Sequence, residues 1–103
     1  RPALYEAWHE ITPLATLERP EALYDVVGPV CESSDVLGTD RRLAIAPGDG
    51  VAILSAGAYG MVMSSNYNSR PRPAEVMVDG ERAVQVLARE SIAALFAGET
   101  TLD

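Results

Sequence analysis

Proline and glycine interrupt this sequence so often that no long helix fits between them. The 103 residues include seven prolines and eight glycines, and the apolar segments that they separate have the length of short strands. The pattern predicts a mainly β fold, a sandwich or barrel with one or two short helices. A chain of this length builds at most one modest core, so we assign residues 1–103 to a single domain.

The first half of the chain alternates between strand-like and polar segments. Residues 23–30 are apolar and β-branched, which predicts a buried strand that breaks at Gly28-Pro29. Residues 31–42 are polar and predict a loop over a site, and residues 43–45 predict a short strand. Residues 1–11 carry apolar side chains at mixed spacing, and we interpret them as a further strand.

The second half contains the clearest local signal. Residues 75–86 predict a hairpin, because two apolar segments flank Asp79-Gly80, a pair favoured in two-residue turns. Before it, residues 51–54 predict a strand, and residues 56–63 predict a strand that enters a short helix. Residues 91–97 predict a helical tail with its apolar side chains on one side.

The composition excludes several classes of function. A net charge of -7 argues against unaided binding to nucleic acid or to an anionic membrane, and no segment approaches the roughly 20 apolar residues of a membrane helix. With a single cysteine, Cys31, and a single histidine, His9, an internal disulfide and a Cys/His zinc site are excluded. We predict no metal site and expect a cytoplasmic protein.

All eight basic residues are arginines, so the chain contains no lysine. Any chemistry that needs a lysine Schiff base must therefore take the lysine from elsewhere. The chain begins at Arg1-Pro2 without a methionine, and we expect it to be a piece of a longer protein.

Two clusters are candidates for a site. Residues 31–35, Cys-Glu-Ser-Ser-Asp, follow a predicted strand, where a scaffold commonly presents functional groups. The alternative is an acidic loop with a buried cysteine. Tyr59 stands between small residues that let a backbone approach a ligand, and its phenol can donate a hydrogen bond to an anion. Its alternative is a tyrosine that caps the core.

Other residues carry less information. Arg1 and Tyr5 offer a guanidinium and a phenol to a carboxylate, but such pairs are too common to indicate a site alone. Residues 70–73, Arg-Pro-Arg-Pro, form either an anion clamp or, as we favour, a rigid loop with solvated arginines. We interpret His9 as a structural histidine and Trp8 as a core residue.

Three motifs occur in order along the chain: RPALYEAWHEI, VVGPVCESSD and AGAYGMVMSSNYNSRPRPAEVMVDG. In this order they resemble the C-terminal part of the diaminopimelate decarboxylases, over nearly the whole chain. The most specific elements are CES followed by an acid, and GAYG leading into SSNYNSRPRPAE. Ornithine and arginine decarboxylases share the cysteine and the GAY-type tyrosine but usually lack the NSRPRPAE segment.

The resemblance implies a homodimeric pyridoxal-phosphate enzyme that converts meso-diaminopimelate to L-lysine and CO2. An (α/β)8 barrel carries the cofactor on a lysine, and a β domain closes over it. By the same resemblance, Cys31 is the catalytic cysteine, a proton donor supplied to the neighbouring subunit's site. Glu32 recognises the distal end of the substrate, Arg1 and Tyr5 bind its carboxylate, and Tyr59 contacts the cofactor phosphate and the substrate.

The chemistry is consistent with these roles, since the carbon that loses CO2 needs a positioned acid. A free thiol has a pKa of about 8.5, and burial would keep it neutral. Many relatives have glycine at the position of Ser34, where serine could tighten the loop. Because the barrel and its lysine are absent, we expect this chain alone to bind no pyridoxal phosphate and to be inactive. The alternatives are a decarboxylase of ornithine, arginine or carboxynorspermidine, or a non-catalytic regulatory homologue; the NSRPRPAE segment and Glu32 favour diaminopimelate.

Overall fold

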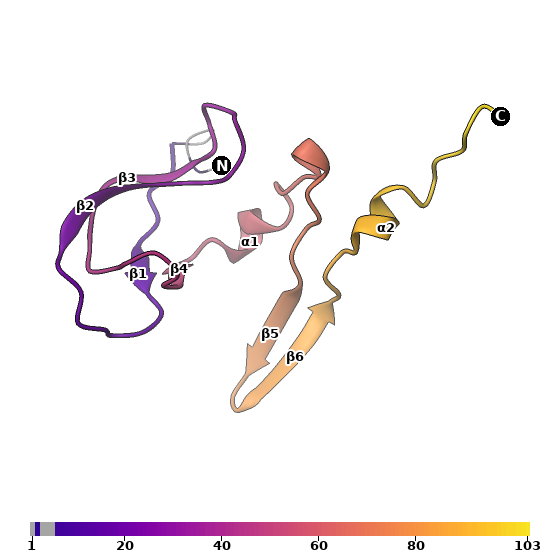
Figure 1. Ribbon diagram of the computed structural model, residues 1–103. Coiled ribbons are helices and arrows are strands. Elements are labelled where there is room, and N and C mark those ends of the chain that lie inside the picture. Colours follow the sequence, from indigo (N-terminus) through magenta and orange to yellow (C-terminus); the bar gives the residue numbers. More distant parts are fainter. Residues whose placement is uncertain (1, 3–5) are drawn as a thin grey trace. The chain divides into compact units, whose positions relative to one another are not determined.

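The computed structural model describes Pro2 and residues 6–103, and it divides into two compact units, Arg1–Gly60 and Met61–Asp103. The regular structure of each unit is mainly short antiparallel strands (Figure 1). The helices are single turns: α1 (Gly57–Gly60), α2 (Ile92–Leu95) and the 3-10 turn η2 (Tyr67–Ser69). The predicted mainly β fold with one or two short helices is confirmed. The described strands pair two by two, and a closed sandwich or barrel stays a prediction.

Two strand pairs build the first unit. Strand β2 (Ala22–Val27) pairs with β3 (Val36–Leu43), and β1 (Ile11–Pro13) pairs with β4 (Val51–Ile53), both antiparallel. Backbone hydrogen bonds from Leu14 to Gly50 and from Leu54 to Glu10 extend the second pair beyond its ends. The small core contains Ile11 of β1 and Leu43 of β3, which are 7% and 5% exposed.

The prediction of a polar loop over residues 31–42 is wrong in its second half. The loop ends at Asp35, and the polar residues from Thr39 to Arg42 lie within β3. An extra residue on β3 bulges at Asp40, where the register shifts and the φ angle is 51°. The carboxylate of Asp25 on β2 accepts the Asp40 N–H at 3.0 Å. Pairing with β2 therefore stabilises a strand whose composition resembles a loop.

Other strand predictions need smaller corrections. The segment 23–30 is a strand only to Val27, and it is not buried in this chain, since Leu23 and Val27 are exposed. The predicted strand at 43–45 is the end of β3, and the strand predicted at 1–11 begins at Ile11 among the described residues. Within residues 56–63 the structure has only the helical turn α1, without a preceding strand. The strand at 51–54 is confirmed.

The second unit is built around the predicted hairpin. Strand β5 (Glu75–Asp79) pairs with β6 (Arg82–Leu87), and the two loop residues are Gly80 and Glu81. The turn thus lies one residue later than the predicted Asp79-Gly80 pair, because Asp79 pairs with Arg82 in the ladder. Gly80 has a φ of 58°, the left-handed region that glycine adopts without strain. The predicted helical tail is confirmed as α2, which begins where the Ser91 hydroxyl accepts the Ala94 N–H at 3.1 Å.

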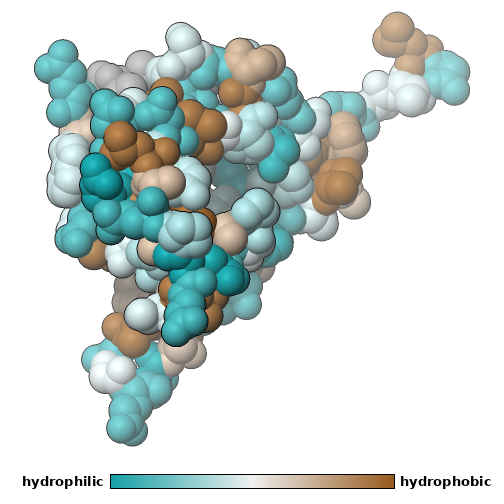
Figure 2. Space-filling view, turned by 60° about the vertical axis from the view of Figure 1, so that its left-hand side comes forward, coloured by the Kyte–Doolittle hydropathy of each residue, from teal (hydrophilic) through white to brown (hydrophobic). Residues whose placement is uncertain are grey.

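Apolar side chains remain at the surface of both units. The space-filling view shows hydrophobic residues beside hydrophilic ones on the visible face (Figure 2). No residue from 61 to 103 is buried. Among the described residues, no helix is long and apolar enough to cross a membrane. Over the same part of the chain, no three histidine, cysteine or acidic side chains gather as metal ligands.

Candidate functional site

The loop between β2 and β3 presents the Cys31–Asp35 cluster at the end of a two-stranded ribbon. Its base is closed by the Gly28 N–H, which donates to the Asp35 carbonyl at 2.9 Å. Inside the loop, the Asp35 N–H donates to the Glu32 carbonyl at 3.0 Å, and the Asp35 carboxylate accepts the Val30 N–H at 3.0 Å. The loop is therefore shaped by its own polar groups rather than by a hydrophobic core.

Gly28 permits this arrangement through its missing side chain. A Cβ atom built at residue 28 would lie 2.2 Å from the Asp35 carboxylate, closer than any real contact. The carboxylate is one of the hydrogen-bonding groups that shape the loop, so it cannot move away without a loss. The sequence analysis recognised a break of the strand at Gly28-Pro29. At this break the Gly28 backbone comes close to the Asp35 side chain, which allows Asp35 to organise the residues around Cys31.

Glu32 is half-buried and engaged within the loop. Its carboxylate accepts the Ser34 N–H at 3.1 Å and also the Ser34 hydroxyl. A residue without a hydroxyl at position 34 would keep only the backbone contact. The expectation that Ser34 tightens the loop agrees with this geometry, and the serine acts on the carboxylate of Glu32 itself.

Cys31 is exposed and forms no disulfide. The alternative of a buried, core-filling cysteine is therefore wrong for this chain. We also expected the thiol to be buried, and the described residues do not bury it.

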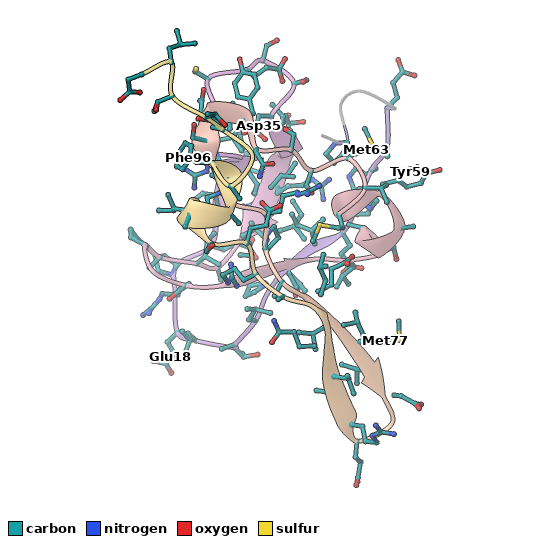
Figure 3. The ribbon with its side chains drawn as sticks, turned by 90° about the vertical axis from the view of Figure 1, so that its right-hand side faces the viewer. Glu18, Asp35, Tyr59, Met63, Met77 and Phe96 are labelled. Carbon is teal, nitrogen blue, oxygen red and sulfur yellow. The ribbon has the colours of Figure 1, made fainter. Side chains whose placement is uncertain are left out.

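Tyr59 lies in α1, away from the loop. Its side chain is 58% exposed, so it does not cap the core of the described unit. A Cβ atom added at Gly57 or at Gly60 would meet nothing within 4 Å, so the two glycines that flank Ala58 and Tyr59 in α1 face open space. Asp35 and Tyr59 lie on separate sides of the first unit (Figure 3). Among the described residues, the Cys31–Asp35 loop and Tyr59 therefore lie apart.

The predictions near the N-terminus have mixed outcomes. Arg1 and Tyr5 lie outside the described residues. Trp8 is 71% exposed, so its assignment to the core is wrong; its ring stacks under a guanidinium instead, with Cζ of Arg41 4.3 Å from the ring centroid. His9 has the structural role expected of it, since its Nδ1 lies 3.1 Å from the Leu54 carbonyl beside β4.

The second unit contains a polar cluster that the sequence analysis missed. The Glu90 carboxylate accepts hydrogen bonds from the Arg72 backbone N–H at 2.7 Å, from Arg72 Nε at 3.0 Å and from Asn66 Nδ2 at 2.6 Å. Arg72 Nη2 lies 2.9 Å from the same carboxylate. The Arg72 N–H, followed by the Arg72 side chain and Asn66, lowers the pKa of Glu90 to about 2.

This cluster corrects the interpretation of residues 70–73 as a loop with solvated arginines. Arg70 is exposed, but Arg72 is an internal ion-pair partner. The pairing of the hairpin strands could have predicted this ion pair. Arg72 lies three residues before Glu75 and Glu90 three residues after its partner Leu87, so the two face each other across the ribbon. Opposite charges at such cross-strand positions stabilise the pairing.

The comparison with protein families gives the decisive observation. The model of the pyridoxal-dependent decarboxylase C-terminal sheet domain matches residues 1–57, more than half of the chain. The chain belongs to this family. The match covers the β2–β3 loop and ends within α1, so the residues that the sequence motifs singled out around Cys31 lie inside the family domain.

Individual members of the family are similar over almost the whole chain. Diaminopimelate decarboxylases of Haemophilus influenzae and Pseudomonas fluorescens are 58% and 54% identical over 99% of it. The crystal structure of diaminopimelate decarboxylase from M. jannaschii covers 98% of the chain with a TM-score of 0.87 and 39% identity. The Helicobacter pylori enzyme complexed with L-lysine covers 94%, with a TM-score of 0.83 and 42% identity.

The chain spans about a quarter of the length of these relatives. The resemblance recognised in the sequence is confirmed, as is its C-terminal placement. The family is named for its dependence on pyridoxal, and the described residues fit one contact with such a cofactor. Tyr59 is largely exposed, and its phenol is a group that can donate to a phosphate oxygen. A lysine to bind the cofactor covalently must come from outside these 103 residues.

Proposed function

We propose that this chain is the C-terminal portion of a diaminopimelate decarboxylase, which converts meso-diaminopimelate to L-lysine and CO2. The observation that carries the proposal is the identity of 54–58% with proteins of that name over 99% of the chain, including the Cys31–Asp35 loop. We further propose that residues 1–103 are the C-terminal β domain of this enzyme, and that the enzyme is a cytoplasmic homodimer.

In this proposal Cys31 supplies the proton. The bond between the α-carbon and its carboxylate breaks, CO2 leaves, and the α-carbon takes up a proton from the thiol Sγ. The resulting thiolate recovers a proton from solvent, so the reaction consumes one proton overall. Exposure of Cys31 at the tip of the β2–β3 loop supports a role in the active site of the partner subunit. Burial of the thiol would then come from that subunit.

Glu32 selects the substrate. Its carboxylate recognises the charged distal end of diaminopimelate, and a site built to pair that charge rejects shorter or uncharged analogues. Hydrogen bonds from Ser34 already hold the Glu32 carboxylate in one orientation. This preorganisation lowers the cost of ordering the side chain when the substrate binds.

Arg1 and Tyr5 bind the substrate carboxylate, and Tyr59 donates a hydrogen bond to the phosphate of pyridoxal phosphate. When bound, this cofactor supplies the electron-withdrawing ring that makes loss of CO2 feasible. Arginine suits the carboxylate because its planar fork donates two parallel hydrogen bonds.

A steady-state assay of the full-length protein tests the proposal. We expect decarboxylation of meso-diaminopimelate with a kcat/KM far above the values for ornithine, arginine and carboxynorspermidine. A preference for one of those three would transfer the function to a related decarboxylase. A folded dimer that is inactive on all four would favour the non-catalytic homologue.

A further inference from the structure

Arg41 of β3 reaches out of its own strand pair to hold the segment that precedes β1. Its Nη1 donates to the His9 carbonyl at 2.6 Å, and its guanidinium lies over the Trp8 ring at 4.3 Å. One side chain thus holds two successive residues, one through its backbone and one through its ring. Arginine is suited to this double contact because its guanidinium is flat and also carries fixed donors.

The packing around Arg41 shows that the contact is specific. A shallow cavity of about 180 Å³ lies between the N-terminal segment and β3, lined by Pro2, Ala7 and Trp8 on one side and by residues 36–39 and Arg41 on the other. The guanidinium spans this gap. Its Nε is buried and has no hydrogen-bond partner among the described residues. Such a buried, unpaired donor lowers stability, so the other contacts of the guanidinium must compensate for it.

Gly38 makes room for the guanidinium. A Cβ atom built at residue 38 would lie 2.8–2.9 Å from Nε, Cζ and Nη2 of Arg41. The backbone of Gly38 does not have a positive φ, so alanine fits the backbone there and would only push the guanidinium aside. The position of the Arg41 head group can therefore be perturbed without removing its charge.

We propose that Arg41 is a positioning residue for the substrate-carboxylate site. The segment that it anchors at Trp8 and His9 continues directly from Arg1 and Tyr5, and the hairpin from which it projects carries Cys31 and Glu32 at its loop. The proposal rests on the proposed function, which assigns Arg1 and Tyr5 to the substrate. In this role Arg41 acts through its contacts with Trp8 and His9 rather than by binding the substrate itself.

Kinetics of the full-length enzyme test this role. Arg41→Met should raise KM for meso-diaminopimelate by about tenfold and leave kcat within about twofold, because the change affects placement of the carboxylate site rather than proton transfer. Arg41→Lys keeps a donor for the His9 carbonyl and should recover part of the loss. Gly38→Ala should shift KM in the same direction by a smaller factor.

Arg42 provides the matched control. It neighbours Arg41 on β3, but it is exposed and pairs with Glu21 at 3.4 Å, so Arg42→Gln should leave both constants unchanged. A merely structural role for Arg41 would lower the melting temperature and the active fraction at an unchanged KM. That pattern, or an equal rise in KM for Arg42→Gln, would overturn the proposal.

Hydrogen exchange separates this inference from the proposed function. In the full-length protein, Arg41→Met should speed exchange in peptides that cover residues 2–10, but not in peptides from β5 and β6. If the wild type does not act on diaminopimelate, the proposed function fails, and faster exchange still supports Arg41 as the anchor of this segment. Unchanged exchange in residues 2–10 overturns the anchor whatever the activity.

Discussion

The two units of this chain hold their shape by different means. In residues 1–60, two strand pairs surround Ile11 and Leu43, and polar groups shape the loop that carries Cys31. In residues 61–103 no side chain is buried. There the carboxylate of Glu90, which follows the hairpin, accepts hydrogen bonds from Asn66 and Arg72, which precede it. The first unit thus combines a small core with a hydrogen-bonded loop, and the second consists of a ribbon with an exposed apolar surface and one ion-pair cluster.

The hairpin of the second unit is apolar on both faces. Val76 and Val78 lie on one face, 59% and 69% exposed, while Met77 and Val84 on the other line a hollow of about 220 Å³. A strand with one solvated face alternates between apolar and polar residues, and a strand covered on both faces does not. The hairpin therefore carries apolar side chains on both faces that its own unit does not cover, whereas the first unit buries Ile11 and Leu43.

The largest expected effect is complete loss of activity in the isolated chain. The 103 residues alone should not decarboxylate diaminopimelate, because they contain no lysine. Incubation with pyridoxal phosphate and then borohydride, followed by mass spectrometry, should give no stoichiometric adduct on any side chain. An adduct on a side chain would show that the first unit is more self-sufficient than proposed.

Replacement of Cys31 should also abolish activity, but subunit exchange with a second inactive variant should restore part of it. In the full-length enzyme, Cys31→Ala and a variant without the cofactor-binding lysine should each be inactive as homodimers. With random exchange half of the dimers are mixed, and one of their two sites is intact, so activity should recover to about a quarter of wild type.

The control for this experiment is a direct measurement of exchange, for example by native mass spectrometry of differently tagged subunits. Verified heterodimers without recovered activity would place Cys31 in the site of its own chain. The loop tip would then act within its own subunit, contrary to what its exposure suggests.

Removal of one charge in the same loop should have an intermediate effect. Glu32→Gln should lower kcat/KM for meso-diaminopimelate by about 30-fold, corresponding to about 2 kcal/mol for a charge pair that loses one partner. The loss should be smaller for 2-aminopimelate, which lacks the distal amino group. Glu21→Gln, at an exposed position before β2, is the matched control and should be neutral. Equal losses on both substrates would give Glu32 a structural role only.

The smallest effect should come from the second unit. The pKa of Glu90 is depressed from 4.5 to about 2, so the folded state favours its ionised form. Its stabilising contribution is present above about pH 4.5 and is lost as the pH falls toward 2. Glu90→Gln should thus destabilise the segment at neutral pH, and the difference from wild type should shrink between about pH 5 and pH 2.

Amide exchange at Arg72 and Glu90 in the full-length protein measures this difference, with Glu81→Gln in the exposed turn as control. The change should speed exchange at both amides and leave the β2–β3 loop unaffected. A difference that stays constant across this pH range would show that the cluster does not depend on the charge of Glu90.

Several features of the chain follow from its sequence because they depend on residues close together along it. Gly80 favours the tight turn between β5 and β6, the Ser91 hydroxyl starts α2, and the apolar residues 51–53 form β4. The motifs around Cys31 and Tyr59 identified the family for a related reason, since they are contiguous and ordered. The acidic cluster after β2 was likewise recognised as a presented loop.

Tertiary structure decided the features that depend on distant partners. The polar residues of β3 form a strand because β2 pairs with them, and the exposed Trp8 ring packs against Arg41, 33 residues later, rather than in the core. Glu90 became the centre of a cluster only when the hairpin brought Arg72 opposite to it. Composition and periodicity report what each residue prefers locally, whereas a cross-strand pair or an ion pair also depends on which residue folding places beside it.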